Sequence, residues 1–234
     1  MKKSLLILLV SGLVIASAGT SFLVTYLVLQ KRRAEEKQKL YNQVFEAHYA
    51  DRVNLFKEEN KHLSNVDISF VGDSLTEGYD VKSYYSTFNV VNRGIGGDTT
   101  FGVEKRLDSS VYDVNPKITS LLIGANNFDT MLENYESIVS KIRTNLPSTK
   151  LVLCSLTSMT GNWGRNNEKA KNNNIEIKKI AERNSCTFVD LYNPLLDPNT
   201  NELKEAYSVD GGHLTAAGYE VVTNTLMPIF QSLL

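Results

Sequence analysis

Hydrophobic positions divide the chain into three parts. Residues 4–30 form an uncharged run in which 18 of 27 residues are apolar. Residues 34–62 are polar, with a stripe of aromatic and apolar side chains at helical spacing. From residue 63 onward, short apolar runs alternate with amphipathic stretches. The pattern predicts a membrane anchor over residues 1–33, a juxtamembrane helical stalk over 34–62 and a globular domain over 63–234.

The first apolar run predicts a membrane-spanning helix. At a rise of ~1.5 Å per residue it would extend about 40 Å, more than the ~30 Å hydrocarbon core of a bilayer. Ala16-Ser17-Ala18 is a cleavage site typical of a signal peptide, but the apolar run continues past it to Leu29. We therefore predict an uncleaved signal anchor over residues 4–30, with a cleaved signal peptide as the alternative.

The charged residues before and after this run help to predict which side of the membrane the domain faces. Two lysines precede the run, and five basic residues follow it within residues 31–39. Counted alone, these charges favour a cytoplasmic domain. A Lys-Lys start directly before an apolar run is instead typical of an export signal. We favour a single-pass protein with an extracytoplasmic domain, against the indication from the charge count.

The polar stretch after the anchor carries a stripe at spacings of four, four, four and three residues. The stripe consists of Tyr41, Phe45, Tyr49, Val53 and Phe56. This spacing predicts a helix that packs on the domain through one face. A coiled-coil stalk is the alternative interpretation.

The remainder of the chain has the pattern of an α/β domain. Apolar runs predict strands at 66–71, 88–91, 118–123, 151–156 and 187–191. Amphipathic stretches predict helices at 98–109, 130–145, 166–184 and 215–233. Strands that alternate with helices indicate a parallel sheet covered on both faces. We predict a doubly wound three-layer α/β/α sandwich with a five-stranded parallel sheet.

Composition adds two exclusions. The 25 basic and 26 acidic residues give a net charge of −1, so no basic excess is present to hold the phosphates of nucleic acid. Cys154 and Cys186 are too few for a disulfide scaffold or a four-cysteine zinc site. We expect both to be buried free thiols.

Polar segments that contain glycine follow four of the predicted strands. They are Gly72-Asp73-Ser74-Leu75, residues 92–98, Gly124-Ala125-Asn126-Asn127 and Asp210-Gly211-Gly212-His213. Because the carboxyl ends of parallel strands meet at one edge of the sheet, these segments should lie together where open α/β sheets bind ligands.

The residue types in these segments suit acyl transfer. A serine hydroxyl needs an adjacent base, and of the three histidines only His213 is placed to reach Ser74. His48 lies in the predicted stalk, and His62 precedes the first strand. Asp210 is placed to accept a hydrogen bond from the other ring nitrogen of His213.

An attacked ester also needs donors for its developing oxyanion. The backbone N–H groups of Ser74 and Gly97 and the side-chain amide of Asn126 would supply three. Each segment also has a structural interpretation, as turn chemistry or as a helix cap at Asp98 or Thr99. Their joint placement at one edge favours catalysis. The glycines do not fit a dinucleotide-binding motif, because Thr99 stands where the third glycine belongs.

The four segments together resemble the blocks of the SGNH (GDSL-type) esterase and lipase superfamily. Residues 92–100, NRGIGGDTT, are similar to the branch that contains the platelet-activating-factor acetylhydrolase catalytic subunits. The resemblance implies a flavodoxin-like sheet with no metal and no organic cofactor. It implies Ser74 as nucleophile, His213 as base and Asp210 as its partner, with Ser74, Gly97 and Asn126 as oxyanion donors. The chain departs from the family at Asn127, where aspartate is frequent.

These observations predict a membrane-anchored serine ester hydrolase that acts on small acyl esters of lipid or cell-envelope carbohydrate. An acyltransferase with the same residues and a catalytically silent binding module are the alternatives. Asn127 and Trp163 are candidates for substrate binding, the latter because residues 157–165 follow the fourth strand and should border the site. Trp163 has an equally good interpretation as a partly buried residue that holds its loop.

Overall fold

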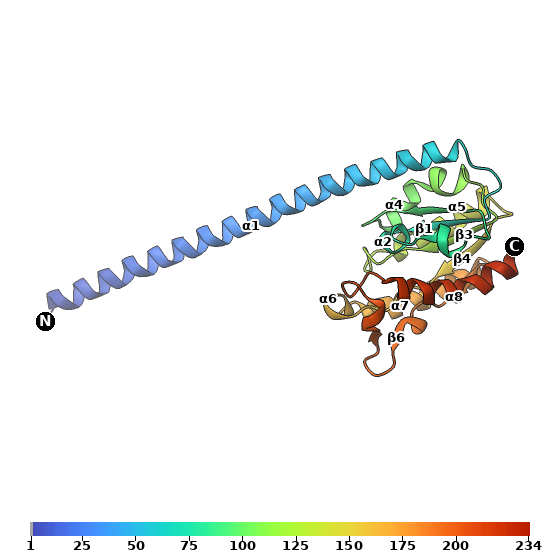
Figure 1. Ribbon diagram of the computed structural model, residues 1–234. Helices are drawn as coiled ribbons and strands as arrows, with labels where there is room; N and C mark the ends of the chain where they lie inside the picture. Colours follow the sequence, from blue (N-terminus) through green and yellow to red (C-terminus); the bar gives the residue numbers. More distant parts are fainter. Residues whose placement is uncertain (1) are drawn as a thin grey trace. The chain divides into compact units, whose positions relative to one another are not determined.

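The computed structural model describes the backbone of residues 2–234 and the side chains of residues 23–234. The chain divides into two compact units, Met1–Ala47 and His48–Leu234. Helix α1 (Lys2–Asn60) provides all the described backbone of the first unit and continues into the second (Figure 1). The second unit therefore starts at His48, within the stretch that the sequence assigns to the stalk.

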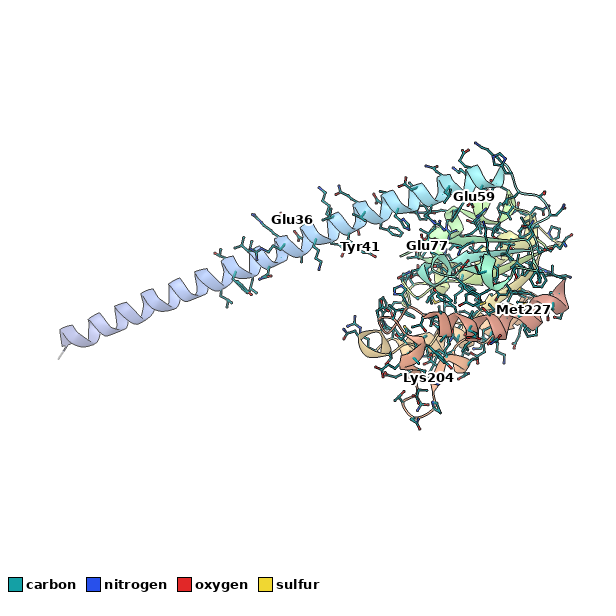
Figure 2. The ribbon with its side chains drawn as sticks, in the orientation of Figure 1. Glu36, Tyr41, Glu59, Glu77, Lys204 and Met227 are labelled. Atoms are coloured by element: carbon teal, nitrogen blue, oxygen red, sulfur yellow. The ribbon has the colours of Figure 1, made fainter. Side chains whose placement is uncertain are left out.

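Helix α1 contains both the predicted membrane span and the predicted packing stripe. The side chains of residues 4–22, most of the predicted span, lie outside the described residues. In the part of the chain that the structure describes, no helix combines the length and hydrophobicity required to cross a membrane. The stripe is divided: Tyr41, labelled in Figure 2, is 60% exposed, whereas Phe56 is completely buried. Packing through one face is thus confirmed at Phe56, which belongs to the second unit.

The predicted five-stranded parallel sheet is confirmed. The strands are β1 (Ile68–Gly72), β2 (Val90–Gly94), β3 (Ile118–Leu122), β4 (Lys150–Cys154) and β5 (Thr187–Val189). Their order in the sheet is β2-β1-β3-β4-β5, and every pairing is parallel. A small antiparallel pair, β6 (Leu196–Asp197) and β7 (Glu202–Leu203), lies outside this sheet.

Helices cover both faces of the sheet (Figure 1). One face packs against α4 (Thr100–Lys105), the π-helical turn η1 (Asp108–Tyr112), α5 (Leu132–Asn145) and α7 (Asn167–Arg183). The other face packs against α2 (Ser74–Glu77), α3 (Val81–Tyr84) and α8 (Ala216–Leu233). Shorter elements are α6 (Gly161–Gly164) and the 3₁₀ turns η2 (Asn193–Leu195) and η3 (Glu205–Tyr207).

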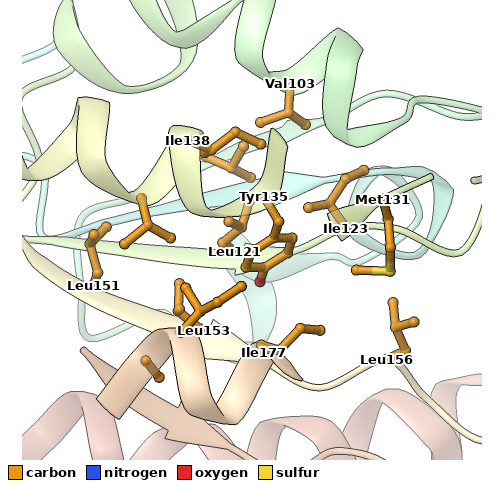
Figure 3. Packing of buried hydrophobic residues seen from close by; sticks show 14 of the residues in the cluster. Val103, Leu121, Ile123, Met131, Tyr135, Ile138, Leu151, Leu153, Leu156 and Ile177 are labelled. Atoms are coloured by element: carbon orange, nitrogen blue, oxygen red, sulfur yellow. The ribbon is translucent and has the colours of Figure 1, made fainter. Parts of the chain in front are cut away.

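The core on the α5 face shows why the strands read as apolar runs. Tyr135 of α5 is completely buried beside Leu121 of β3 and Ile177 of α7, and Figure 3 shows the three side chains together. Burying such side chains stabilises the fold by roughly 1.5–3 kcal/mol each.

Cys154 is buried and Cys186 is partly buried, and both thiols are free.

Strand β2 differs most from its prediction. It was expected at 88–91 and spans Val90–Gly94, because it continues through the polar residue Arg93. The Arg93 guanidinium is completely buried, with NH1 2.6 Å from Glu59 Oε2 and NH2 2.7 Å from Asn60 Oδ1. Side chains from the end of α1 thus compensate a buried charge that a hydropathy pattern treats as the end of the strand.

The predicted helix 98–109 is shorter than expected. Helix α4 spans Thr100–Lys105 and is capped by Thr99, whose side chain accepts the N–H of Gly102 at 3.3 Å. Of the two caps considered from the sequence, Thr99 is therefore the one used. Asp98 has a different partner, a buried arginine at residue 106.

Candidate active site

The sheet topology brings the predicted catalytic segments together. Strand β1 pairs with both β2 and β3, so the chain runs to one side of β1 and then returns to its other side. This arrangement is a topological switch point, where the loops after adjacent strands separate and leave room for a ligand. Ser74 follows β1 and Asn126 follows β3, at the carboxyl edge of the sheet.

Ser74 is the first residue of the short helix α2. Asp73 caps this helix, and its Oδ1 accepts the N–H of Leu75 at 3.0 Å. A side chain at Gly72 would lie 2.2 Å from the carbonyl oxygen of Leu122, so only glycine fits between the two strands. Gly72 therefore allows close strand packing, Asp73 caps the helix, and Ser74 starts it. This order places Ser74 at the edge of the sheet.

His213 connects Ser74 with Asp210. Its Nε2 atom lies 2.9 Å from Ser74 Oγ, and its Nδ1 atom lies 2.7 Å from Asp210 Oδ2. The other carboxylate oxygen of Asp210 accepts the backbone N–H groups of Gly212 and His213 at 3.0 and 2.8 Å. These hydrogen bonds, led by the N–H of His213, lower the pKa of Asp210 to about 2. Asp210 is thus ionised at neutral pH and oriented to hold the imidazole.

Trp163 packs on the glycines between Asp210 and His213. A side chain at Gly212 would lie 3.1 Å from the Trp163 ring, and the Trp163 and His213 rings form an edge-to-face pair at 6.3 Å. Gly211 has a φ of +95° and its carbonyl oxygen accepts the N–H of Thr160 at 2.8 Å. The structure thus shows that Trp163 packs on residues 210–213, here called the His213 loop. The predicted contact of Trp163 with substrate stays a prediction.

Two of the three predicted oxyanion donors lie on the loops after β2 and β3, the strands on either side of β1. Gly97 has a φ of +80°, a conformation that favours glycine and that sets the direction of the peptide groups in this turn. The Nδ2 atom of Asn126 donates a hydrogen bond to the carbonyl oxygen of Asp98 at 2.8 Å. The amide nitrogen of Asn126 carries two N–H groups. One of them makes this bond, which holds the side chain in place, and the second can donate to an oxyanion.

Asn127 connects its loop with the start of α4. Its Nδ2 donates to the Thr100 hydroxyl at 3.0 Å, and its Oδ1 accepts the N–H of Thr100 at 3.3 Å. These contacts give the side chain a structural role. The binding of substrate by Asn127 stays a prediction.

Comparison with known proteins establishes the family. The model of the GDSL-like lipase/acylhydrolase family matches residues 70–221, which include Ser74, Gly97, Asn126, Asp210 and His213. The chain belongs to this family. It is therefore a serine-type hydrolase of carboxylic esters, as the sequence predicts.

Two solved structures and a curated relative resemble this GDSL-like hydrolase. Human platelet-activating factor acetylhydrolase IB subunit alpha2 is 26% identical over 183 residues, which cover 72% of this chain and 77% of the human protein. A structure from Streptococcus pneumonia, provisionally described as a platelet activating factor, has a TM-score of 0.76 and 26% identity, with 82% and 97% of the chains covered. A GDSL-like lipase from Bacteroides thetaiotaomicron shares the fold, with a TM-score of 0.69, 24% identity and 78% and 98% coverage.

Sequence reasoning missed a buried arginine that joins the catalytic loops of this GDSL-like hydrolase. Arg106 Nε lies 2.8 Å from Asp98 Oδ2, and both side chains are 1% exposed. Arg106 also donates to the carbonyl oxygens of Gly72 at 2.9 Å and Arg93 at 2.8 Å. Burial raises the pKa of Asp98, and the Arg106 charge acts against this rise. The only sequence signal was a charged pair eight residues apart in a predicted amphipathic helix.

Asp73 is a second buried acid next to the nucleophile. Its side chain is completely enclosed, and burial raises its pKa to about 7 although the Leu75 N–H favours the carboxylate. The Asp98 carboxylate raises this pKa further. Asp73, the residue before Ser74, therefore changes its charge near neutral pH.

Two histidines lie outside this hydrogen-bonded chain, and one of them is close to it. His48, which the sequence places in the stalk, belongs to the same compact unit as Ser74 and lies 3.1 Å from Glu77 Oε2. Within the described residues, no group of three or more histidine, cysteine, aspartate or glutamate side chains forms a metal-binding cluster.

Proposed function

We propose that this protein is a membrane-anchored serine ester hydrolase that removes small acyl groups from lipid or cell-envelope carbohydrate esters. The observation that supports catalysis is the continuous hydrogen-bond chain Ser74–His213–Asp210, with distances of 2.9 and 2.7 Å. These two hydrogen bonds also argue against a catalytically silent binding module. Together they activate a serine, and a protein that only binds its ligand has no need of them.

The proposed reaction begins with attack of Ser74 Oγ on the ester carbonyl carbon, while His213 Nε2 takes the hydroxyl proton. Asp210 holds the imidazole by its Nδ1–H and stabilises its positive charge. The tetrahedral intermediate then collapses, the C–O bond to the alcohol breaks, and His213 gives the proton to the departing oxygen. The acyl group remains on Ser74 until His213 activates a water molecule that hydrolyses the acyl-serine.

The oxyanion would be stabilised by three donors. They are the backbone N–H groups of Ser74 and Gly97 and the second side-chain N–H of Asn126. The hydrogen bond from Asn126 to the Asp98 carbonyl supports this role, because it holds the amide in place before substrate arrives. Donors that are fixed in advance stabilise charge that develops only in the transition state.

Two observations support the proposed substrate class. The human relative is named as an acetylhydrolase of platelet-activating factor, and it shares 26% identity with this chain. The apolar run at residues 4–30 would hold the enzyme at a membrane, where lipid and envelope esters are concentrated. We propose further that the catalytic domain faces the outside of the cell, since the Lys-Lys start resembles an export signal.

The experiment that tests this proposal compares ester substrates with the purified enzyme comprising residues 31–234 and its Ser74→Ala variant. We expect hydrolysis of p-nitrophenyl acetate to exceed that of the octanoate, and we expect the variant to be inactive and unlabelled by a fluorophosphonate. Retained hydrolysis or labelling in Ser74→Ala would refute the nucleophile. Addition of an alcohol acceptor distinguishes the alternative, because an acyltransferase would give an acylated alcohol in place of free acid.

A further inference from the structure

We infer that Glu77 is a positioning residue for the oxyanion hole, and that Arg52 and His48 of helix α1 hold Glu77 in place. Glu77 acts on residues 94–97, here called the oxyanion loop, which contain the proposed donor Gly97. The inference rests on the proposed function, since it assigns a role within the same reaction. Residues 48–52 of α1, which the sequence assigned to a stalk, would thus help to position the oxyanion hole.

Glu77 lies on the same short helix as the nucleophile. It follows Ser74 by three residues on α2, so both side chains lie on neighbouring positions of one helical turn. Its Oε2 atom accepts the backbone N–H of Gly96, in the middle of the oxyanion loop. A carboxylate on the nucleophile's own helix therefore sets the distance between that helix and the loop.

Two side chains from α1 complete this arrangement. His48 Nε2 lies 3.1 Å from Glu77 Oε2, and Arg52 Nε lies 3.3 Å from Glu77 Oε1. Arg52 also donates through NH2 to the carbonyl oxygen of Gly94 at 2.9 Å. The loop is thus held at its first carbonyl by Arg52 and at the Gly96 N–H by Glu77, and an ion pair joins these two side chains.

The space around Gly96 shows how closely these groups approach the nucleophile. A Cβ atom at Gly96 would lie 3.1 Å from Glu77 Oε2 and 3.9 Å from both His48 Nε2 and the Cβ of Ser74. Gly96 therefore lies close to the nucleophile on one hand and to Glu77 and His48 on the other. Glu77, labelled in Figure 2, has a side chain that is 26% exposed, so solvent only partly weakens these contacts.

Loss of the Glu77 carboxylate should act on the transition state and not on substrate binding. Without it, the Gly96 N–H loses its acceptor and the next peptide group, which carries the Gly97 donor, loses its fixed direction. A displacement of about 1 Å in such a group can lower the rate by roughly 10²-fold. Because the oxyanion forms only during reaction, kcat should fall while KM changes little.

The experiment compares Glu77→Ala, Glu77→Gln and Glu58→Ala in the full-length protein in detergent micelles, with p-nitrophenyl acetate as substrate. Glu58 is the matched control, a glutamate of α1 whose exposed carboxylate pairs with Lys61. We expect Glu77→Ala to lower kcat by roughly 10- to 100-fold with KM within about twofold. Glu77→Gln keeps an oxygen that can accept the Gly96 N–H, so it should recover most of this loss. Glu58→Ala should match the wild type.

A transition-state analogue separates positioning from a general loss of stability. An alkyl boronic acid forms a tetrahedral adduct with serine whose oxygen occupies the oxyanion position. Its affinity should fall for Glu77→Ala by the same factor as kcat, even if the thermal midpoint also falls. A kcat within twofold of the control, a loss confined to KM, or equal losses in Glu77→Ala and Glu77→Gln would overturn the inference. Failure of the proposed function would appear separately, as an active Ser74→Ala enzyme.

Discussion

Arg106 and Asp98 form an ion pair within the core, with an Nε–Oδ2 distance of 2.8 Å and both side chains 1% exposed. Asp98 directly follows the proposed oxyanion donor Gly97, and its carbonyl oxygen holds Asn126. Arg106 also binds the carbonyl oxygen of Gly72, two residues before Ser74. One buried pair therefore joins the loops that carry the nucleophile and two of the proposed oxyanion donors.

Removing one partner of this pair should strongly destabilise the fold. Arg106→Met leaves the Asp98 carboxylate buried without its counter-charge, which typically costs about 3–5 kcal/mol. The double variant Asp98→Asn/Arg106→Met should be more stable than Arg106→Met alone, because it leaves no unpaired charge. Urea unfolding of the four proteins in this double-mutant cycle measures the coupling. Additive losses would show that the two side chains do not act as a pair.

The pH dependence of stability should contain a contribution from Asp73. Its pKa in the folded protein, about 7, is above the ordinary value of 3.8, so the folded state binds the proton more tightly than the unfolded state. Between these pH values Asp73 therefore lowers stability as pH rises, by at most about 1.4 kcal/mol for each pH unit, and above pH 7 its effect is constant.

Asp73→Asn should remove this dependence and keep the cap, since an amide oxygen can still accept the Leu75 N–H. We expect the stability of Asp73→Asn relative to the wild type to increase by roughly 2–3 kcal/mol from pH 5 to pH 8. Denaturant unfolding at both pH values measures this difference. A difference that is the same at pH 5 and pH 8 would contradict the raised pKa.

The sheet and the catalytic segments were predictable because both depend on local pattern. Buried parallel strands are continuous apolar runs, and the residues after them must lie at one edge whatever the detailed packing. Ser74, His213 and Asp210 could be brought together from this rule and from the scarcity of histidine. The positions of the oxyanion donors came from the family resemblance and the same edge rule.

Other features depend on partners far apart in the sequence. The extension of β2 through Arg93 requires Glu59 and Asn60, which lie more than thirty residues earlier, in the segment that the sequence assigned to the stalk. Arg106 looks like an ordinary exposed residue of an amphipathic helix until its three carbonyl and carboxylate partners are known. The aromatic stripe predicted that this segment packs on the domain, but hydropathy treats buried charges as surface positions, so the pairing of Arg93 with Glu59 and Asn60 was not predictable.

The two neighbouring asparagines after β3 should differ in their effects on catalysis. Asn126→Ala removes a proposed oxyanion donor and should lower kcat by about 10²–10³-fold with little change in KM. Asn127→Ala is the matched control, because its polar atoms bind Thr100 and should affect stability more than chemistry. Steady-state kinetics of both variants provide the measurement. An effect of Asn126→Ala on KM alone would mean that the amide binds the ground-state substrate.

Trp163 should affect the rate through the His213 loop. Trp163→Ala removes the ring that packs on Gly212 and His213, so the imidazole would lose a fixed orientation. We expect kcat to fall by roughly 10-fold for p-nitrophenyl acetate, a substrate too small to require a tryptophan for binding. Trp163→Phe keeps an aromatic ring on the glycines and should retain most activity. If the variants lose activity only toward large substrates, Trp163 acts in binding.

Truncations should separate the anchor from the part of α1 that the enzyme needs. Deletion of residues 1–30 should release an active enzyme from the membrane fraction, because the contacts that hold Ser74, His213 and Asp210 all lie beyond Ala47. The full-length protein should stay in the membrane after a carbonate wash, as expected of an uncharged 27-residue span. Full-length protein that the wash extracts would contradict the proposed anchor.

Deletion of residues 1–62 should instead abolish folding, although it removes only what the sequence assigned to anchor and stalk. Arg93 would lose its contacts with Glu59 and Asn60, and the surface that Phe56 covers would be exposed to water. Loss of the completely buried Phe56 should cost about 3–5 kcal/mol. The loss of Phe56 alone is thus a large part of the stability of a typical domain, about 5–15 kcal/mol. A soluble and cooperatively folded protein of residues 63–234 would show that the end of α1 is not needed for folding, and a wild-type kcat in that protein would contradict the positioning role of Arg52 and His48.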